Sequence, residues 1–311
     1  MKRLFLVLAC AAVASSLLAD KPQPFAPLAP TAMVTIAGSP LTINIGDDTR
    51  MQVYNSNVPG TGQFYPPSGT LGNSGVWINY GATLYGPFLG TAYAPVSLSP
   101  VTGTGTAGDP FTVVVVVNAG ATLQVTDTIT YVNGAAAANV TISVAAIPPP
   151  ATPTIPEGGI AFKAFIGADL YLAGNDAGFP VAVPGASAGS HGADESCVTQ
   201  LQYTIAFLGT TPMDAYCAVG YSQVYSEIES GNLANDVAPG CLDDGAALQW
   251  NRTFVPGQPV VINTGVSFTG NAVPVGPTAQ VPTLSVAGIT ALVVLLAAVG
   301  YVLARKTSLG A

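Results

Sequence analysis

The sequence predicts an all-β protein: a large β-sandwich body between a cleaved signal peptide and one C-terminal transmembrane helix. Three observations support this prediction. Alternating or β-branched runs are separated by Gly, Pro, Asn and Asp, the residues that turns require. The 311 residues are 49% hydrophobic and only 8% charged, so the chain can bury a large core. Uncharged apolar runs lie near both ends of the chain.

The first 19 residues are typical of a secretory signal peptide. Lys2 and Arg3 precede an apolar run at 4–14, and the small Ala19 precedes the expected cleavage site. The segment 7–10 loosely resembles a lipobox, but the apolar run before it is shorter than a signal peptide needs. Export by cleavage after Ala19 is therefore the main prediction, and lipidation is the alternative.

Residues 20–32 form a Pro-rich spacer, and the body extends over residues 33–272. One short helix is expected at 222–229. The nearly continuous Val run at 111–117 predicts a strand that is buried on both faces. Strands are expected at 41–45, 51–54, 76–80, 111–117, 122–132, 140–144, 160–172, 201–208, 248–255 and 260–268.

A Pro-rich connector at 148–156 divides the body into halves at 33–147 and 157–272. Each half is large enough to be a sandwich of its own, so two packed domains are one interpretation. We favour the other, one large body of two sheets that both halves share. A linker at 273–280 then leads to the C-terminal segment.

Residues 286–304 contain no charge, and a helix of 19 residues spans about 28 Å, close to the ~30 Å of a bilayer core. Arg305 and Lys306 follow directly and predict that this end stays in the cytoplasm. The body would then lie outside the membrane.

A short motif precedes this helix, and it consists of Val281, Pro282, Thr283, Leu284 and Ser285. Motif, apolar helix and basic end together resemble the IPTL-CTERM sorting signal of exported bacterial proteins, over about the last 31 residues. The resemblance implies export, temporary anchoring in the inner membrane, and handling by an exosortase-like protease. Val281 stands where Ile is usual.

The exported part, residues 20–280, is strongly acidic. It contains all 16 acidic residues and four basic ones, so its formal charge is 4 − 16 = −12. This charge excludes nucleic acid as a partner and disfavours anionic lipids, but it attracts divalent cations. Calcium is therefore the one ion considered, with Asn175–Asp176, Asn235–Asp236 and Asp243–Asp244 as candidate ligands. No other cofactor is expected.

The cysteines agree with export to an oxidising compartment. Cys10 leaves with the signal peptide, and two of Cys197, Cys217 and Cys241 are expected to form a disulfide. The pairs Cys197–Cys217 and Cys217–Cys241 would each close a loop of about 20 residues. The sequence does not choose between them, and one thiol is left over.

No residue merits a catalytic role on sequence grounds. The GxGxxG match at 103–108 is interpreted as a turn, because a strand rather than a helix follows it. The GxSxG match at 185–189, close to His191, is interpreted as a flexible loop without the strand–helix context of a nucleophile. The aromatic clusters are interpreted as core. Four pairs of carboxylates are interpreted as solvated turns: Asp47–Asp48, Asp194–Glu195, Glu227 with Glu229, and Asp243–Asp244.

We therefore expect a non-enzymatic surface protein with a structural or interaction role at the cell envelope or in an extracellular matrix, whose ligand stays open. One alternative is a carbohydrate-active enzyme on a β-sandwich, which would show converging carboxylates and aromatics in a cleft. The other is a calcium-dependent binding module.

Overall fold

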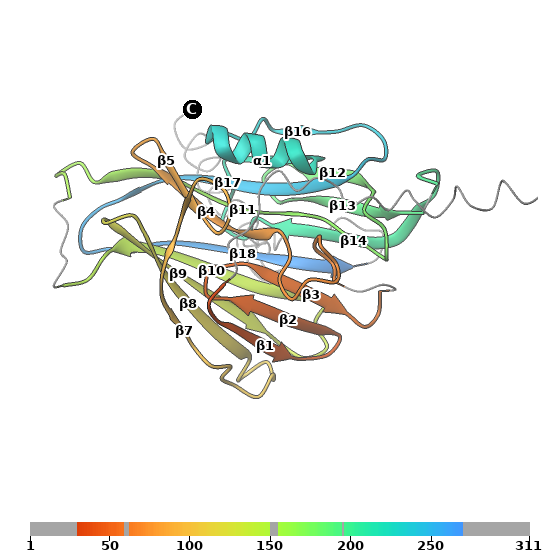
Figure 1. The fold of residues 1–311 in the computed structure, drawn as a ribbon, viewed down its shortest axis with the longest axis horizontal. Coiled ribbons are helices and arrows are strands. Elements are labelled where there is room, and N and C mark those ends of the chain that lie inside the picture. The colour runs from red at the N-terminus through yellow and green to blue at the C-terminus, as the bar shows by residue number, and fades with distance from the viewer. Residues whose placement is uncertain (1–29, 59–61, 150–154, 195, 270–311) are drawn as a thin grey trace, which may run out of the picture. The chain divides into compact units, whose positions relative to one another are not determined.

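A computed structural model describes residues 30–58, 62–149, 155–194 and 196–269. These residues form three β-sheets and one short helix (Figure 1), so the predicted all-β character is confirmed for the described part of the chain. The signal peptide 1–19, the linker 273–280 and the segment 281–311 lie outside the described residues.

The largest sheet has eight antiparallel strands in the order β12-β13-β14-β18-β10-β9-β8-β7. Its strands are β7 (Ala94–Leu98), β8 (Phe111–Ala119), β9 (Leu123–Tyr131), β10 (Ala137–Ala146), β12 (Gly178–Val183), β13 (Ser187–Ala193), β14 (Gln200–Leu208) and β18 (Val260–Thr269).

The second sheet has seven strands in the order β16-β15-β17-β11-β4-β5-β6, in which β15–β16 and β5–β6 pair in parallel. Its strands are β4 (Ser74–Tyr80), β5 (Thr83–Gly86), β6 (Thr91–Ala92), β11 (Ile160–Asp169), β15 (Ala215–Gly220), β16 (Asp236–Val237) and β17 (Asp244–Phe254). A third sheet consists of β1 (Met33–Ala37), β2 (Leu41–Gly46) and β3 (Met51–Asn55).

Both large sheets contain strands from both halves of the body. In the eight-stranded sheet β10 pairs with β18, and in the seven-stranded sheet β4 pairs with β11. Neither sheet is therefore complete until the second half of the body has paired with the first.

A single apolar core joins the three sheets. Fully buried side chains from the three-stranded sheet (Ile43), the eight-stranded sheet (Val115, Ile142) and the seven-stranded sheet (Ile166, Leu248) belong to one cluster. Burial of these alternating strand faces is the main driving force for folding.

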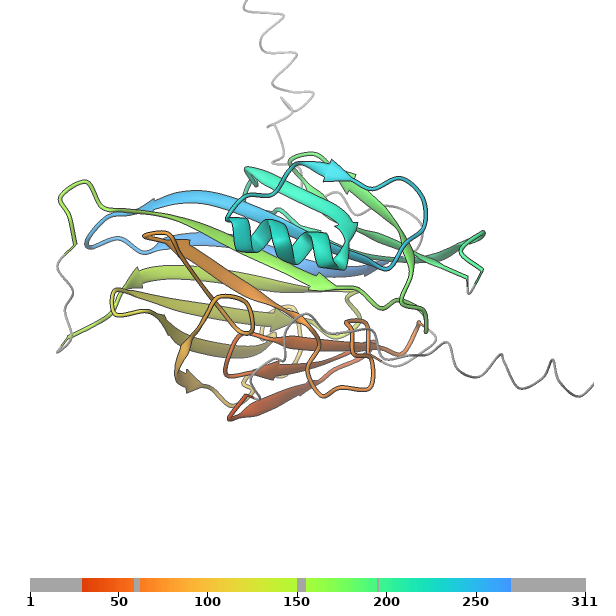
Figure 2. The same ribbon diagram turned by 45° about the horizontal axis from the view of Figure 1, so that its top comes forward.

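Helix α1 (Tyr221–Ser230) covers the other face of the seven-stranded sheet, where it packs on β11, β15 and β17 (Figure 2). Its buried residues Val224, Tyr225 and Ile228 form a second apolar cluster with Trp77 and Phe165. The helix expected at 222–229 is thus confirmed. At its end, Lys163 donates hydrogen bonds to the carbonyl of Gly231, 2.7 Å away, and to Asn232.

Two local expectations are wrong. Strand β8 is buried on one face only, because Val113, Val115 and Val117 point into the core while Val114 and Val116 stay partly exposed. The segment predicted as a flexible loop around 185–189 instead opens β13, whose residues are all buried.

The small residues of β13 explain this second error. The strand lies between β12 and β14, and a Cβ at Gly189 would collide with the carbonyl oxygen of Ile205. Gly and Ser predict a loop from local preference alone, yet they are needed here because backbones approach closely.

Both outer strands of the eight-stranded sheet contain a proline. Pro95 lies in β7, next to a shift in register, and Pro180 lies in β12. Proline has no backbone N–H, so it is tolerated at sheet edges and hinders the pairing of a further strand.

Tyr131 ties the three-stranded sheet to the eight-stranded sheet. Its buried hydroxyl accepts a hydrogen bond from the backbone N–H of Leu41 at 3.2 Å and donates one to the carbonyl of Ala135 at 3.1 Å.

We expect Tyr131→Phe to lower the free energy of unfolding by about 1–3 kcal/mol, because it leaves buried backbone groups without a partner. Denaturant titration would measure the change. Tyr171→Phe is the matched control, since it removes an exposed hydroxyl that donates to Gly174, and it should cost less than about 0.5 kcal/mol. Equal losses in the two variants would contradict the proposed role of Tyr131.

Candidate functional site

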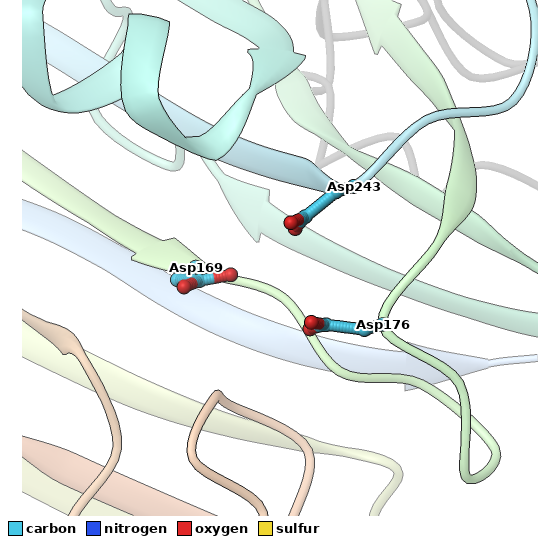
Figure 3. Close-up of side chains that lie close together, drawn as sticks. All are labelled: Asp169, Asp176 and Asp243. Atoms are coloured by element: carbon cyan, nitrogen blue, oxygen red, sulfur yellow. The ribbon is translucent and has the colours of Figure 1, made fainter. Parts of the chain in front are cut away.

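Three aspartates from separate segments converge at one end of the seven-stranded sheet (Figure 3). Asp169 is the last residue of β11, Asp176 lies in the loop before β12, and Asp243 directly precedes β17. One carboxylate oxygen of each lies within 4.8 Å of one oxygen of the other two. Asp169 is fully buried, and the other two are half-buried.

Backbone pairing explains why these residues meet. Strands β11 and β17 are antiparallel with Asp169 opposite Gly245, so the end of one strand lies beside the start of the other. Gly178 and Leu242 exchange two backbone hydrogen bonds of 2.9 and 3.0 Å, which brings the loop with Asp176 next to Asp243.

Helix α1 contacts this cluster at Asp169. The hydroxyl of Tyr225 accepts a hydrogen bond from the backbone N–H of Asp169 at 3.1 Å and donates to the carbonyl of Asn73 at 2.8 Å. Burial, and then the negative charge of Asp169, raise the pKa of Tyr225 well above its ordinary value. Tyr225 therefore stays a neutral hydrogen-bonding group beside the carboxylates.

Asp244 follows Asp243 but points to the opposite side, into the core. It lies against Ser190 and Gly178, where a Cβ at position 178 would collide with both. Burial raises the pKa of Asp244 to about 8, and the nearby Asp243 and Asp176 add to this effect. Asp244 is therefore largely protonated at neutral pH and adds little charge to the cluster.

Three converging carboxylates have a clear chemical use. Depending on whether each binds through one or both oxygens, they supply three to six oxygen ligands. Calcium takes about six to eight oxygens from carboxylates, carbonyls and water at about 2.3–2.6 Å. The donor set therefore fits a hard divalent cation.

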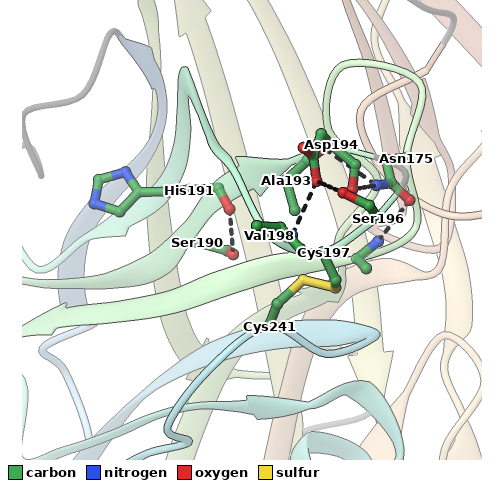
Figure 4. Close-up of a disulfide and its surroundings, with 10 residues drawn as sticks. Asn175, Ser190, His191, Ala193, Asp194, Ser196, Cys197, Val198 and Cys241 are labelled. Carbon is green, nitrogen blue, oxygen red and sulfur yellow. Dashed lines mark hydrogen bonds between the residues drawn. A yellow bond between two sulfur atoms is a disulfide. The ribbon is translucent and has the colours of Figure 1, made fainter.

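A disulfide lies close to this cluster and joins Cys197 to Cys241 (Figure 4). It links the loop after β13 to the segment that carries Asp243. Asn175, next to Asp176, donates hydrogen bonds to the carbonyls of Ala193 and Asp194 at 3.1 and 2.9 Å. The segments of two cluster residues are thus attached to the same loop.

The carboxylate of Asp194 organises that loop. It accepts hydrogen bonds from Ser196 at 2.9 Å and from the backbone N–H of Val198 at 3.0 Å. Hydrogen bonds from the backbone of Val198 and Thr199 lower the pKa of Asp194 to about 2. Asp194 is therefore ionised at neutral pH.

The predicted disulfide between two of the three cysteines is present, but it is neither of the two pairings that the sequence suggested. Cys217, which both pairs required, is the free cysteine of the described chain and lies buried under α1. Burial raises the pKa of its thiol well above the ordinary value, which disfavours the reactive thiolate. The observed pair is 44 residues apart in sequence, because β14, β15, α1 and β16 intervene.

Ser187 and His191 do not form a catalytic pair. Both lie on β13, four residues apart, which separates them by about 13 Å along a strand. His191 Nδ1 instead lies 2.7 Å from the hydroxyl of Thr204, and burial lowers the pKa of the imidazole. The GxGxxG match at 103–108 is a turn before β8, as predicted.

Several paired carboxylates are not the solvated turns that the sequence suggested. Asp47, Asp48 and Asp244 are buried, and Asp48 forms a 2.7 Å ion pair with Arg50. Of the three calcium candidates, Asp176 and Asp243 come together, while Asp236 lies elsewhere and accepts a hydrogen bond from Gln223.

Sequence reasoning missed Asp169. Its one sequence signature is a single carboxylate at the end of an apolar run, and such a residue usually caps a strand or faces solvent. Its proximity to Asp243 follows from the pairing of β11 with β17, which no local pattern reveals.

The C-terminal residues Val281–Ser285, Arg305 and Lys306 lie outside the described residues. Residues 279–306 match the IPTL-CTERM motif. The resemblance expected from the sequence is confirmed, and this IPTL-CTERM tail implies an exported, C-terminally sorted protein. No helix among the described residues has the length and apolar character to cross a bilayer, and the predicted helix 286–304 is not among them.

Comparisons of the whole chain find similarity in fold only. A bacterial glucoamylase complexed with acarbose is 8% identical, with a TM-score of 0.50, 79% of this chain covered and 33% of the glucoamylase covered. This chain thus spans about a third of that enzyme, and the likeness does not assign its activity. No curated protein matches the chain.

Two further solved structures have lower TM-scores. A heparan sulfate lyase from Pedobacter heparinus is 7% identical, with a TM-score of 0.43, 80% of this chain and 37% of that chain covered. A galactose mutarotase related enzyme from Lactobacillus acidophilus is 8% identical, with a TM-score of 0.40. The match covers 78% of this chain and 99% of that chain.

We expect the double substitution Cys197→Ser and Cys241→Ser to lower the free energy of unfolding by up to about 4 kcal/mol, the loop-entropy value for a 44-residue separation. Denaturant titration with and without a reducing agent would measure this. Cys217→Ala is the control, because it retains the disulfide and should lose the same stability on reduction as the wild type. Unchanged stability of the double variant would refute the stabilising role of the disulfide.

Proposed function

We propose that this chain is an exported surface protein that is handled by an exosortase-like sorting protease and whose body acts by binding rather than by catalysis. The observation that carries the proposal is the match of residues 279–306 to the IPTL-CTERM motif. The predicted signal peptide at 1–19 and the apolar run at 286–304 are consistent with this route.

The composition of the body supports a binding or structural role at the envelope or in an extracellular matrix. Its formal charge of −12 keeps it apart from polyanions and anionic head groups. Its one histidine is hydrogen-bonded to Thr204 and lies far along the strand from Ser187, which disfavours classical serine chemistry.

The sorting proposal is tested in the native host, by fractionation followed by mass spectrometry of both mature termini. We expect a chain that begins at Asp20, ends near Thr283, and lies at the surface or in the matrix. The triple substitution Pro282→Ala, Thr283→Ala and Leu284→Ala should leave an uncut chain in the inner membrane.

The matched control for that experiment is Pro277→Ala with Thr278→Ala, a second Pro-Thr pair just before the matched segment. It should be processed like the wild type. A wild-type chain that keeps its intact tail in the inner membrane would contradict processing and would make the protein a permanently anchored ectodomain.

A calcium-dependent binding module is the second candidate function. The convergence of Asp169, Asp176 and Asp243 favours it, because three separate segments bring oxygen ligands together. The disulfide and the hydrogen bonds of Asn175 support the segments that carry Asp243 and Asp176. Bound calcium would neutralise part of a strongly negative surface and order the loop around Asp176.

Calcium binding is tested by thermal unfolding with and without millimolar calcium. At 100 times the dissociation constant, calcium would add about 2.7 kcal/mol, which corresponds to a rise in Tm of roughly 5–10 °C. The double substitution Asp176→Asn and Asp243→Asn should abolish the rise, and magnesium should replace calcium poorly because it prefers octahedral sites.

The charge-matched control is Asp109→Asn with Glu229→Gln, which removes two exposed carboxylates away from the cluster. It should keep the full calcium response. An unchanged Tm of the wild-type protein in millimolar calcium would exclude the calcium-dependent function and leave the sorting proposal unaffected.

A further inference from the structure

Asp127 is a carboxylic acid in the middle of the apolar core. Strand β9 alternates regularly, with Thr126 and Thr128 on the partly exposed face and Val125, Asp127 and Ile129 on the buried face. Asp127 is 2% exposed. A buried acid in this position is unusual, because native carboxylates are ordinarily exposed or paired with a base.

The neighbours of Asp127 in its own sheet are aliphatic. Its direct cross-strand partners are Val115 on β8 and Ile142 on β10, and both are fully buried. The other inward side chains of these two strands are Ala and Val, so β8 and β10 contribute no ionisable group on this face.

Tyr93, between β6 and β7, is the ionisable side chain that faces Asp127 within the described part of the chain. It is itself buried, and its hydroxyl donates a hydrogen bond of 3.2 Å to the carbonyl of Val76 on β4. The inward residues of β4 here, Val76 and Ile78, are apolar. No described group forms a hydrogen bond with Asp127 Oδ1.

This environment accepts a neutral carboxylic acid far better than a carboxylate. An ionised Asp127 would have lost its hydration without gaining a positive partner or a hydrogen bond at Oδ1. The geometry thus agrees with the effect of burial on Asp127, which raises its pKa to about 8.

We propose that Asp127 is a proton-operated switch in the core, which allows the eight-stranded sheet to pack when it is protonated and loosens that packing when it ionises. The proposal is independent of the sorting tail and of the calcium site. The contribution of this one group to the stability of the body is greatest under acidic conditions and is lost as the surroundings become alkaline.

The sign of the effect follows from linkage. The unfolded chain loses this proton near pH 4, whereas the folded chain keeps it until about pH 8. Between these values the folded state binds one more proton than the unfolded state, so the unfolding equilibrium constant increases by about tenfold per pH unit for this group.

The test is the slope of the logarithm of the unfolding constant against pH, measured by denaturant titration between pH 5 and 7. We expect Asp127→Asn to lower the wild-type slope by about one, and to make the protein more stable than the wild type at pH 7. Asp109→Asn, an exposed carboxylate near the same sheet, is the control and should leave the slope unchanged.

An Asp127→Asn protein with the wild-type slope would overturn the proposal. If this variant does not fold, the same slope is measured on Asp127→Leu, which has no polar group to satisfy. Failure of both uncharged variants to fold would show that the core requires the carboxyl group itself, and would also overturn the switch.

Discussion

The structure depends on two strands that join distant parts of the chain. Strand β18 lies between β10 and β14, and β11 lies between β4 and β17, so each large sheet is completed by a strand from the second half. The alternating apolar faces are buried only when both sheets are closed. Non-local pairing of this kind is slow to form, because long loops must close before their contacts stabilise the fold.

The same pairings place the ionisable groups. The antiparallel register of β11 and β17 brings Asp169 beside Asp243 at one end of a sheet, and the alternation of β9 turns Asp127 inward. Asp169 and Asp243 thus lie together at the end of a sheet. Asp127 instead lies in the apolar core, which disfavours a charged group. Both outcomes follow from backbone geometry rather than from side-chain preference.

Most strands that combine alternation with β-branched residues could be predicted from the sequence, as β9 illustrates with its Thr and aliphatic positions. Strand β13 could not be, because its Gly, Ala and Ser residues favour a loop unless the closeness of neighbouring backbones is known. For the candidate site, Asp176 and Asp243 belonged to predicted pairs, but Asp169 and the Cys197–Cys241 link depend on register between distant segments. Such register is a property of the assembled sheets.

The prolines at the two borders of the eight-stranded sheet have a consequence for a protein that is sorted by its tail. An exposed strand at the border of a sheet can pair with a strand of another molecule. Pro95 in β7 and Pro180 in β12 each remove one backbone donor from these borders. The missing donors disfavour edge-to-edge pairing of the largest sheet between molecules.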